Sequence, residues 1–298
     1  GLELTLSNFL KHYHLSIYDF YGKSGDRSFQ RMKVEAGLSN EFICDHEKMV
    51  TKRLPGLFHT NSSSYIAFLL RYLEDQKVTN PTEELMLGMF YYTFYNQAPP
   101  KEGFRSFEEG LNVILKTKEM CEEIKAILSY LYSSIHFVEL ESEFTFNCPL
   151  KVHCNYSTSQ VLAAFGYFNE KKNPAFREGV KHFEDKNLDI FFITLNKSEK
   201  DFSPSTLYDD YAINEKLFHW QTQSRVAEGS KTSERYIHHK KNGHQIALFV
   251  REYKTEHGYT SPFVFLGTCE YIKHSGSKPM SFVWELKEEM PPGMVTKA

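Results

Sequence analysis

Cationic and aromatic side chains alternate in one part of the chain, from residue 207 to residue 286. Between Lys216 and Lys254 there are eight lysines and arginines but three glutamates, although the whole chain has a net charge of −3. Lysine and arginine displace the counterions of a phosphate backbone, and aromatic rings stack on bases. This stretch therefore favours contact with nucleic acid, and the alternative is a charged sheet face that only maintains solubility.

Two parts of the sequence supply candidate contacts. We expect His219, Trp220 and Gln221 to contact bases or stack on them, and the lysines and arginines from residue 225 to residue 251 to contact phosphates. A second edge is expected at residues 151–156, where a strand leads into a helix whose N-terminal amides could bind a phosphate or a modified backbone. The candidate nucleic-acid-binding residues are Lys151, His153, Tyr156, His219, Trp220, Gln221, Arg225, Lys231, Arg235, His238, Lys240, Lys241 and Arg251.

Fragments of catalytic motifs occur, but each lacks a required partner. Gly22-Lys23-Ser24 resembles part of a phosphate-binding loop, yet the glycine needed five residues earlier is Ile17. His239-Lys240-Lys241 imitates the His-x-Lys of phospholipase-D-like nucleases without the later aspartate. Glu252-Tyr253-Lys254 imitates the acidic-x-Lys limb of magnesium-dependent nucleases, whose second carboxylate would have to come from an upstream loop. We therefore expect no catalytic residues, no metal site and no cofactor, with a magnesium-dependent nuclease as an alternative.

Length and composition indicate a globular protein of two domains without a membrane anchor. A chain of 298 residues exceeds the usual size of one domain. The five cysteines are odd in number and form no Cys-x-x-Cys, so neither a disulfide framework nor a zinc site is expected. Reduced thiols in a cytoplasm fit these cysteines best. No apolar run approaches the roughly 20 residues of a membrane helix. The chain begins with Gly1 and not with methionine, which suggests a tag remnant or a fragment of a longer protein.

The first half, residues 1–135, is predicted to be a helical domain. Apolar residues recur there at a spacing of three to four, often behind a serine, threonine or asparagine that could cap a helix. Residues 1–150 carry a charge balance of −5, whereas residues 151–298 carry +2. The expected helices lie near residues 7–10, 28–36, 62–73, 82–95 and 107–132.

The second half, residues 136–298, is predicted to be a mixed, mainly antiparallel, barrel-like β domain with one or two helices. Asn242-Gly243 predicts a hairpin, because both positions of such a turn favour a positive φ. Regular turns suggest a barrel or a strongly curved sheet, so the whole chain is expected to be α+β. The expected strands lie at 144–146, 150–154, 189–195, 236–238 and 246–250, a short helix at 157–165 before Gly166, and further turns at 256–259 and 274–277.

Blocks of this sequence resemble the signature blocks of a bacterial family of domains of unknown function. They are Leu207-Tyr208-Asp209-Asp210-Tyr211-Ala212-Ile213, Leu217-Phe218-His219-Trp220-Gln221-Thr222-Gln223-Ser224, Arg235-Tyr236-Ile237-His238-His239, Leu248-Phe249-Val250-Arg251-Glu252 and Pro279-Met280-Ser281-Phe282-Val283-Trp284-Glu285-Leu286. The resemblance is strongest over residues 150–290 and weaker through the helical half. That family occurs C-terminal to superfamily-2 helicase modules, often with a phospholipase-D-like nuclease at the N-terminus, and has no settled activity. The resemblance implies the C-terminal part of a helicase-nuclease of restriction or phage defence.

The residues and the resemblance lead to the same expectation. We expect a non-catalytic module that binds duplex DNA and could read a modified base or backbone, with helicase and nuclease domains of the same polypeptide as its other partners. One alternative is a protein-interaction or autoinhibitory module, in which the acidic helical half docks on the motor. The other is the magnesium-dependent nuclease, with Glu252 and Lys254 as its candidates.

Overall fold

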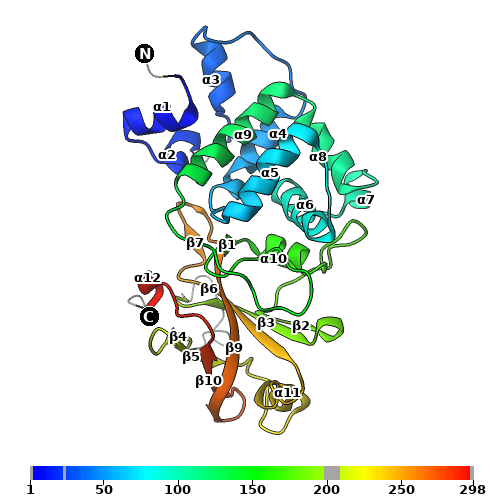
Figure 1. The fold of residues 1–298 in the computed structure, drawn as a ribbon, viewed down its shortest axis with the longest axis vertical. Helices are drawn as coiled ribbons and strands as arrows, with labels where there is room; N and C mark the ends of the chain where they lie inside the picture. Colours follow the sequence, from blue (N-terminus) through cyan, green and yellow to red (C-terminus); the bar gives the residue numbers. More distant parts are fainter. Residues whose placement is uncertain (1–2, 23–24, 198–208, 296–298) are drawn as a thin grey trace. The chain divides into compact units, whose positions relative to one another are not determined.

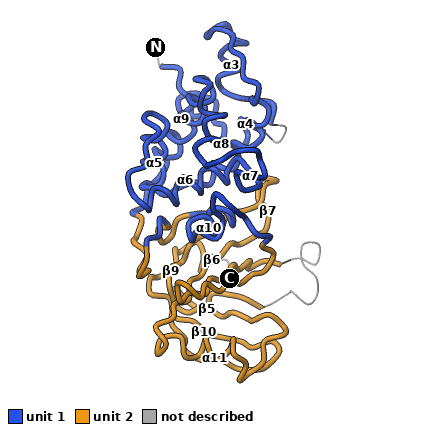
Figure 2. The backbone as a smooth tube through the Cα atoms, turned by 90° about the vertical axis from the view of Figure 1, so that its right-hand side faces the viewer, with its two compact units in different colours: residues 1–138, 147–149, 155–175 blue, residues 139–146, 150–154, 176–298 orange. Residues whose placement is uncertain are grey.

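The computed structural model of the protein describes residues 3–22, 25–197 and 209–295 (Figure 1). It confirms the predicted α+β class, with an N-terminal helical region and a mixed sheet of eight strands. Two compact units are distinguished in Figure 2. The helical unit comprises residues 1–138, 147–149 and 155–175, and the sheet unit comprises residues 139–146, 150–154 and 176–298.

Six helices of the helical unit begin where the sequence places capping side chains. The side chains of Thr5, Ser16, Ser28, Ser62, Asn80 and Ser106 each accept a hydrogen bond from the backbone N–H three residues later. The helices are α1 (Leu6–Tyr13), α2 (Ile17–Tyr21), α3 (Phe29–Glu35), α4 (Glu47–Arg53), η1 (Leu54–Leu57), α5 (Ser63–Asp75), α6 (Pro81–Phe94), α7 (Pro99–Glu102), α8 (Phe107–Leu115), α9 (Lys118–Ser133) and α10 (Thr158–Ala164).

Helix α10 belongs to the helical unit, although its residues lie in the second half of the sequence. Ser157 and Gln160 form a reciprocal capping box at its start, and Gly166 follows its end with a φ of +73°. The predicted helix at residues 157–165 is therefore confirmed. α10 packs against α6, and its residues 161–164 are all buried.

A buried carboxylate joins three helices of this unit. Glu123 of α9 is fully buried and accepts hydrogen bonds from the backbone N–H groups of Phe29 (2.8 Å) and Gln30 (2.9 Å) and from the Tyr21 hydroxyl. The two N–H groups belong to the first turn of α3, which has no intrahelical acceptors for them. Burial raises the pKa of Glu123, and these hydrogen bonds oppose the rise.

The sheet unit contains an open sheet. Seven strands follow the order β2-β3-β6-β9-β10-β5-β4, in which β3 and β6 are parallel and the other neighbours antiparallel. β1 (Asn155–Tyr156) belongs to the helical unit. The elements of the sheet unit are β2 (Val180–Phe183), η2 (Glu184–Lys186), β3 (Leu188–Thr194), β4 (Tyr211–Ala212), β5 (Leu217–Gln221), α11 (Lys231–Ile237), β6 (Gln245–Arg251), β7 (Thr255–Glu256), β8 (Tyr259–Thr260), β9 (Phe263–Ser275), β10 (Ser281–Leu286) and α12 (Pro292–Val295).

The prediction of a barrel-like closure is wrong. β2 and β4 stand at the two ends of the strand order and do not pair with each other. A barrel requires every strand to have a partner on both sides. Here the end strands are only four and two residues long, so they offer few backbone groups for the hydrogen bonds that would close a barrel.

Aromatic side chains form the core between the sheet and α11. Phe191 of β3 stacks on Trp220 of β5 with ring centroids 4.0 Å apart, and Phe282 stacks on Trp284 of β10 at 5.4 Å. Tyr236 of α11 packs edge-on against these rings and is itself buried. This core holds α11 on one face of the sheet.

Some local predictions in this half are wrong. Residues 231–237 form α11 and not a strand, so Asn242-Gly243 lies in a helix-to-strand turn. The Ser230 side chain caps α11 by accepting from Ser233 N–H, and this start signal outweighs the hairpin signal. Residues 144–146 and 150–154 are not strands, and only Val152 forms an isolated bridge, with Leu140.

The remaining strand and turn predictions are confirmed. β3 contains all but the last residue of the expected strand at 189–195, β6 contains the expected strand at 246–250, and turns connect β7 to β8 and β9 to β10. No helix among the described residues combines the length and the apolar character needed to cross a bilayer.

Candidate nucleic-acid interface

Helix α11 presents cations outward from the aromatic core. Ser233 and Tyr236 are buried on its inner side, whereas Lys231 and His238 are exposed. A turn with Lys240 and Lys241, both exposed, follows the helix. We call the exposed basic side chains around this helix, Arg225, Lys231, His238, Lys240 and Lys241, the α11 surface.

The acidic neighbours of the α11 surface hold its cations only weakly. Lys240 Nζ lies 2.9 Å from Glu270 Oε2, Arg225 lies 3.5 Å from Glu178, and His238 lies 3.3 Å from Glu234. Exposed pairs of this kind contribute about 0–1 kcal/mol, so their cations can turn to another anion at little cost. Lys231 and Lys241 make no ion pair within the described part of the chain.

The α11 surface has dimensions that suit a nucleic-acid strand. Seven residues of helix separate Lys231 from the turn, a distance of about 10 Å at about 1.5 Å per residue. Phosphates of one DNA strand follow one another at about 3.4 Å along the helix axis. Residues 237–241 and the neighbouring Glu270 and Tyr271 also line an open depression of about 430 Å³. Cations at both ends of α11 can therefore contact phosphates about three positions apart on one strand.

A buried ion pair fixes α11 on the sheet. Arg235 Nε and Nη2 donate to the two carboxylate oxygens of Asp189 at 2.7 and 3.1 Å, and the Asp189 side chain is fully buried. Asp189 belongs to β3, so this two-point contact sets the position of the helix. Arg235 is one of the predicted phosphate contacts, and in the structure its guanidinium forms an ion pair with Asp189.

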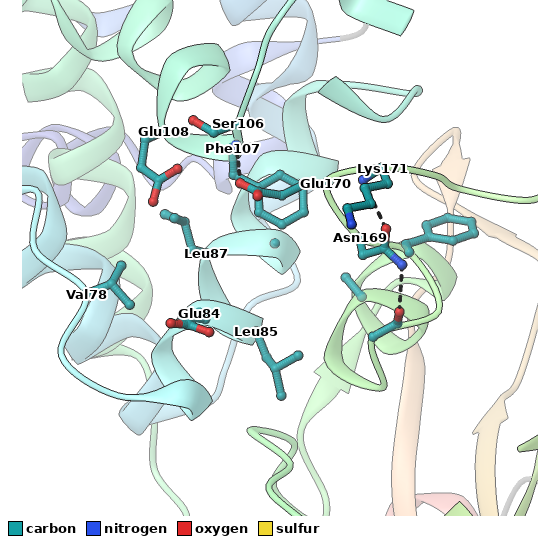
Figure 3. Close-up of a pocket in the computed structure, with 14 residues that line it drawn as sticks. Val78, Glu84, Leu85, Leu87, Ser106, Phe107, Glu108, Asn169, Glu170 and Lys171 are labelled. Atoms are coloured by element: carbon teal, nitrogen blue, oxygen red, sulfur yellow. Dashed lines mark hydrogen bonds between the residues drawn. The ribbon is translucent and has the colours of Figure 1, made fainter. Parts of the chain in front are cut away.

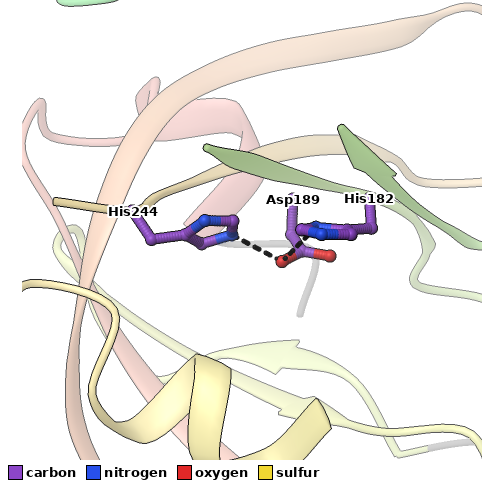
Figure 4. Close-up of side chains that lie close together, drawn as sticks. All are labelled: His182, Asp189 and His244. Carbon is purple, nitrogen blue, oxygen red and sulfur yellow. Dashed lines mark hydrogen bonds and ion pairs between the residues drawn. The ribbon is translucent and has the colours of Figure 1, made fainter. Parts of the chain in front are cut away.

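Two histidines complete the surroundings of Asp189. Figure 4 shows His182 of β2 and His244, just before β6, converging on this carboxylate. His244 Nε2 lies 2.6 Å and His182 Nδ1 lies 3.3 Å from Asp189 Oδ2. Burial alone would raise the pKa of Asp189, but hydrogen bonds from His244 and Arg235 outweigh it, so this pKa lies below its ordinary value. Burial lowers the pKa of His182 and favours its neutral form.

The histidines and the aspartate could in principle bind a metal ion. Their ligand atoms lie within 4.8 Å of one another, and two histidines with one carboxylate form a known ligand set. However, the guanidinium of Arg235 already neutralises Asp189 from 2.7 Å and would repel a divalent cation at the same oxygen. The arrangement suits a hydrogen-bonded anchor for α11 better than a metal centre.

A small pocket adjoins this anchor. It has a volume of about 160 Å³, and its walls include Thr222, Arg225, Thr232, Arg235 and Trp220. Aromatic, hydroxyl and guanidinium groups together can surround a planar polar ring or a small substituent. The pocket thus lies between the α11 surface and the buried Asp189.

The predicted base-contacting residues on β5 are occupied within the fold. Trp220 is only 5% exposed, because Phe191 covers one face of its ring. His219 stacks on Tyr211 at 4.6 Å, and its Nδ1 lies 2.7 Å from the Asp209 carbonyl oxygen. Gln221 accepts a hydrogen bond from Asp209 N–H. Residues 207 and 208 of the same sequence block lie outside the described residues.

The other predicted contacts lie away from α11. Lys151 pairs with Glu141, and His153 N–H donates to the Phe265 carbonyl near the start of β9. On the α11 surface, Lys240 pairs with Glu270 of the same strand. Glu270 lies five residues after Phe265, which is about 17 Å along the strand at about 3.4 Å per residue. Tyr156 is buried in the helical unit.

β6 starts after the turn that follows α11, and the next predicted contact lies at the far end of this strand. Arg251, its last residue, donates to Thr194 and to the Ser261 carbonyl. Glu252 and Lys254 follow that end, whereas the upstream carboxylates Glu228 and Glu234 lie beside α11, before the start of β6. The described residues therefore do not gather the carboxylates that the alternative, a magnesium-dependent nuclease, would need. Lys23 and Ser24 of the phosphate-loop fragment lie outside the described residues.

The sequence interpretation missed Asp189, His182 and His244. One signal was present, because Asp189 is the only charged residue in the buried run from Leu188 to Ile193. A carboxylate in such a run requires a cationic or hydrogen-bonding partner. Its partners come from β2, α11 and the turn before β6, and the sequence did not indicate which residues these would be.

A comparison with protein families finds a match to the second half of the chain. The family model described as Domain of unknown function (DUF3427) matches residues 150–298, which is half of the chain. No curated protein matches the sequence.

Proposed function

This chain belongs to the DUF3427 family, and we propose that it binds DNA without catalysis, through the α11 surface of its sheet unit. The observation that carries the proposal is the set of exposed cations at both ends of a helix that a buried ion pair fixes in place. Lysine and arginine with weak internal partners release counterions on binding phosphate, and a fixed helix loses little conformational freedom.

The finer proposal concerns what this module reads and where it works. The pocket beside Thr232 and Arg235 would admit an altered base or backbone group, while the α11 surface holds the phosphates. The resemblance described above further suggests that the parent protein is a bacterial helicase-nuclease of restriction or phage defence. There the module would hold or inspect DNA while the motor moves.

Reversing three charges of the α11 surface should abolish most of the affinity for DNA. Counterion release favours binding by roughly eightfold per phosphate contact at 0.1 M relative to 1 M salt. We therefore expect Lys231→Glu/Lys240→Glu/Lys241→Glu to weaken binding on the order of 100-fold at 0.1 M salt and to reduce the salt slope by roughly two to three. Fluorescence anisotropy with labelled duplex and single-stranded DNA over a salt series measures both quantities.

The matched control is Lys101→Glu/Lys118→Glu/Lys216→Glu, which makes the same change of charge at exposed positions that are not part of the α11 surface. This control should retain most of the affinity. Equal losses in the two triple variants would show that only net charge matters. Absence of binding by the unaltered chain at low salt would refute the proposal.

Filling the small pocket should remove selectivity and leave general DNA binding intact. Thr232 is partly exposed at the pocket wall, so Thr232→Phe adds volume there without changing charge. We expect any preference for methylated or phosphorothioate duplex over plain duplex to fall to within about twofold, while the salt slope stays the same. Thr232→Ser is the control, and a preference that survives Thr232→Phe would place the reading site elsewhere.

A further inference from the structure

The helical unit contains a cavity whose chemistry is opposite to that of the α11 surface. The cavity has a volume of about 780 Å³, within the range of about 300–1,000 Å³ typical of ligand sites. Its walls come from the first turns of α6, the start of α8 and the loop after α10. All of these elements belong to the helical unit.

Hydrogen bonds hold the walls of this cavity in place. The Tyr92 hydroxyl of α6 donates to the Asn169 carbonyl at 2.7 Å, and Phe107 N–H of α8 donates to Glu170 Oε1 at 2.8 Å. The Asn169 side chain accepts from Lys171 N–H and donates to the Gly166 carbonyl. The loop after α10 is therefore attached to both helices, and the cavity is preformed.

Apolar and acidic side chains share the lining. Figure 3 shows Glu84 of α6 and Glu108 of α8 on either side of Leu87, with Val78 and Leu85 nearby. Both carboxylate side chains are exposed, and neither makes a hydrogen bond or an ion pair with any described residue. Glu170 adds a third carboxylate, against one lysine, Lys171.

The negative charge of the cavity affects its surroundings. Burial and then the charge of Glu108 raise the pKa of Tyr72 to about 12. A phosphate backbone would be repelled here. A cation between Glu84 and Glu108 would relieve their mutual repulsion, and an apolar neighbour of that cation would cover Leu87 and Val78.

We infer that this cavity docks a basic segment of a partner protein, in which an arginine or lysine lies beside an apolar side chain. The arginine or lysine contacts Glu84 and Glu108, and the apolar side chain fills the space between α6 and α8. The inference is independent of the DNA-binding proposal, because it concerns another unit and a ligand of the opposite charge.

The probe is a fluorescein-labelled peptide rich in arginine and leucine, tested by anisotropy with the whole chain in the absence of DNA. A peptide with citrulline in place of each arginine keeps the shape and removes the charge. We expect the arginine peptide to bind saturably and at least about tenfold more tightly than the citrulline peptide, a difference of about 1.4 kcal/mol.

Two variants separate the cavity from the general acidity of the unit. Glu84→Lys/Glu108→Lys should weaken peptide binding by at least about tenfold. Leu85→Trp, which fills the cavity without changing charge, should weaken it to a similar extent. The control Asp26→Lys/Glu35→Lys makes the same change of charge at exposed positions of the helical unit and should have little effect. Thermal melting checks that every variant is folded.

Four results would overturn the inference. Equal binding of the arginine and citrulline peptides would show that no charged contact contributes to binding. Equal losses in the Glu84/Glu108 and Asp26/Glu35 variants, or full binding by Leu85→Trp, would show that the cavity itself is not used. Displacement of the peptide by spermidine at comparable concentrations would make a small polyamine the occupant and not a protein segment.

Discussion

Asp189→Ala should lower the free energy of unfolding of the sheet unit by about 3 kcal/mol or more, because it leaves Arg235 without its buried partner. His244 would lose its acceptor at the same time. Both tryptophans of the chain, Trp220 and Trp284, lie in the core beside α11, so their fluorescence during urea unfolding reports this unit. Because Asp189 also anchors α11, the affinity for DNA should fall as well.

The matched control is Asp185→Ala. Asp185 lies four residues earlier, and its exposed side chain pairs with Lys186. We expect a change of less than about 1 kcal/mol there, since exposed ion pairs contribute little. The sign of the pH dependence follows from the lowered pKa of Asp189: its contribution is present above the ordinary pKa of 3.8 and is lost as the pH falls through the folded-state value. A tryptophan transition in Asp189→Ala that coincides with that of the unaltered chain would show that the ion pair does not stabilise the unit.

Glu123→Ala should destabilise the helical unit by about 3–5 kcal/mol. The substitution removes the acceptor of three buried donors, namely Phe29 N–H, Gln30 N–H and the Tyr21 hydroxyl. Each unsatisfied buried group costs about 1–3 kcal/mol. The helical unit contains neither tryptophan, so far-ultraviolet circular dichroism measures its unfolding.

Two further variants test the physical cause. Glu123→Gln keeps the size of the side chain but turns one acceptor oxygen into a donor that faces a backbone N–H or a hydroxyl, so it should recover only part of the loss. Glu122→Ala removes the neighbouring carboxylate, which is partly exposed and lies 3.6 Å from Lys118, and should change stability by less than about 1 kcal/mol. Full stability in Glu123→Gln would mean that neither the negative charge nor the second acceptor oxygen of Glu123 is needed.

The helices of the first half could be predicted because their signals are local. Serine, threonine and asparagine caps stand three residues before the amides that they bind, as at Ser62 and Asn80. Ser157 with Gln160 marked α10 in the same way. By contrast, the face of α9 that contains Met120, Ile124 and Ile127 also contains Glu123, and its partners lie 93 to 102 residues away in the sequence.

The candidate site was predicted only in outline. The basic segment was evident from composition, and Lys231, Lys240 and Lys241 are exposed as a DNA contact requires. Arg235, however, forms an ion pair with Asp189, and the ring of Trp220 stacks on that of Phe191. Both outcomes depend on which strands are neighbours in the sheet, and the parallel pairing of β3 with β6 has no signature in the residues of either strand.

The path of the chain between the units determines where genetic recombination would separate residues that pack against each other. The chain leaves the helical unit after residue 138, returns for residues 147–149 and 155–175, and ends in the sheet unit. A genetic exchange at residue 150, where the family match begins, would give α6 and α10 different ancestors although they pack against each other. Recombination there would combine two surfaces that had not evolved together. We therefore expect both units to descend as one block, with compensating substitutions between α6 and residues 161–164.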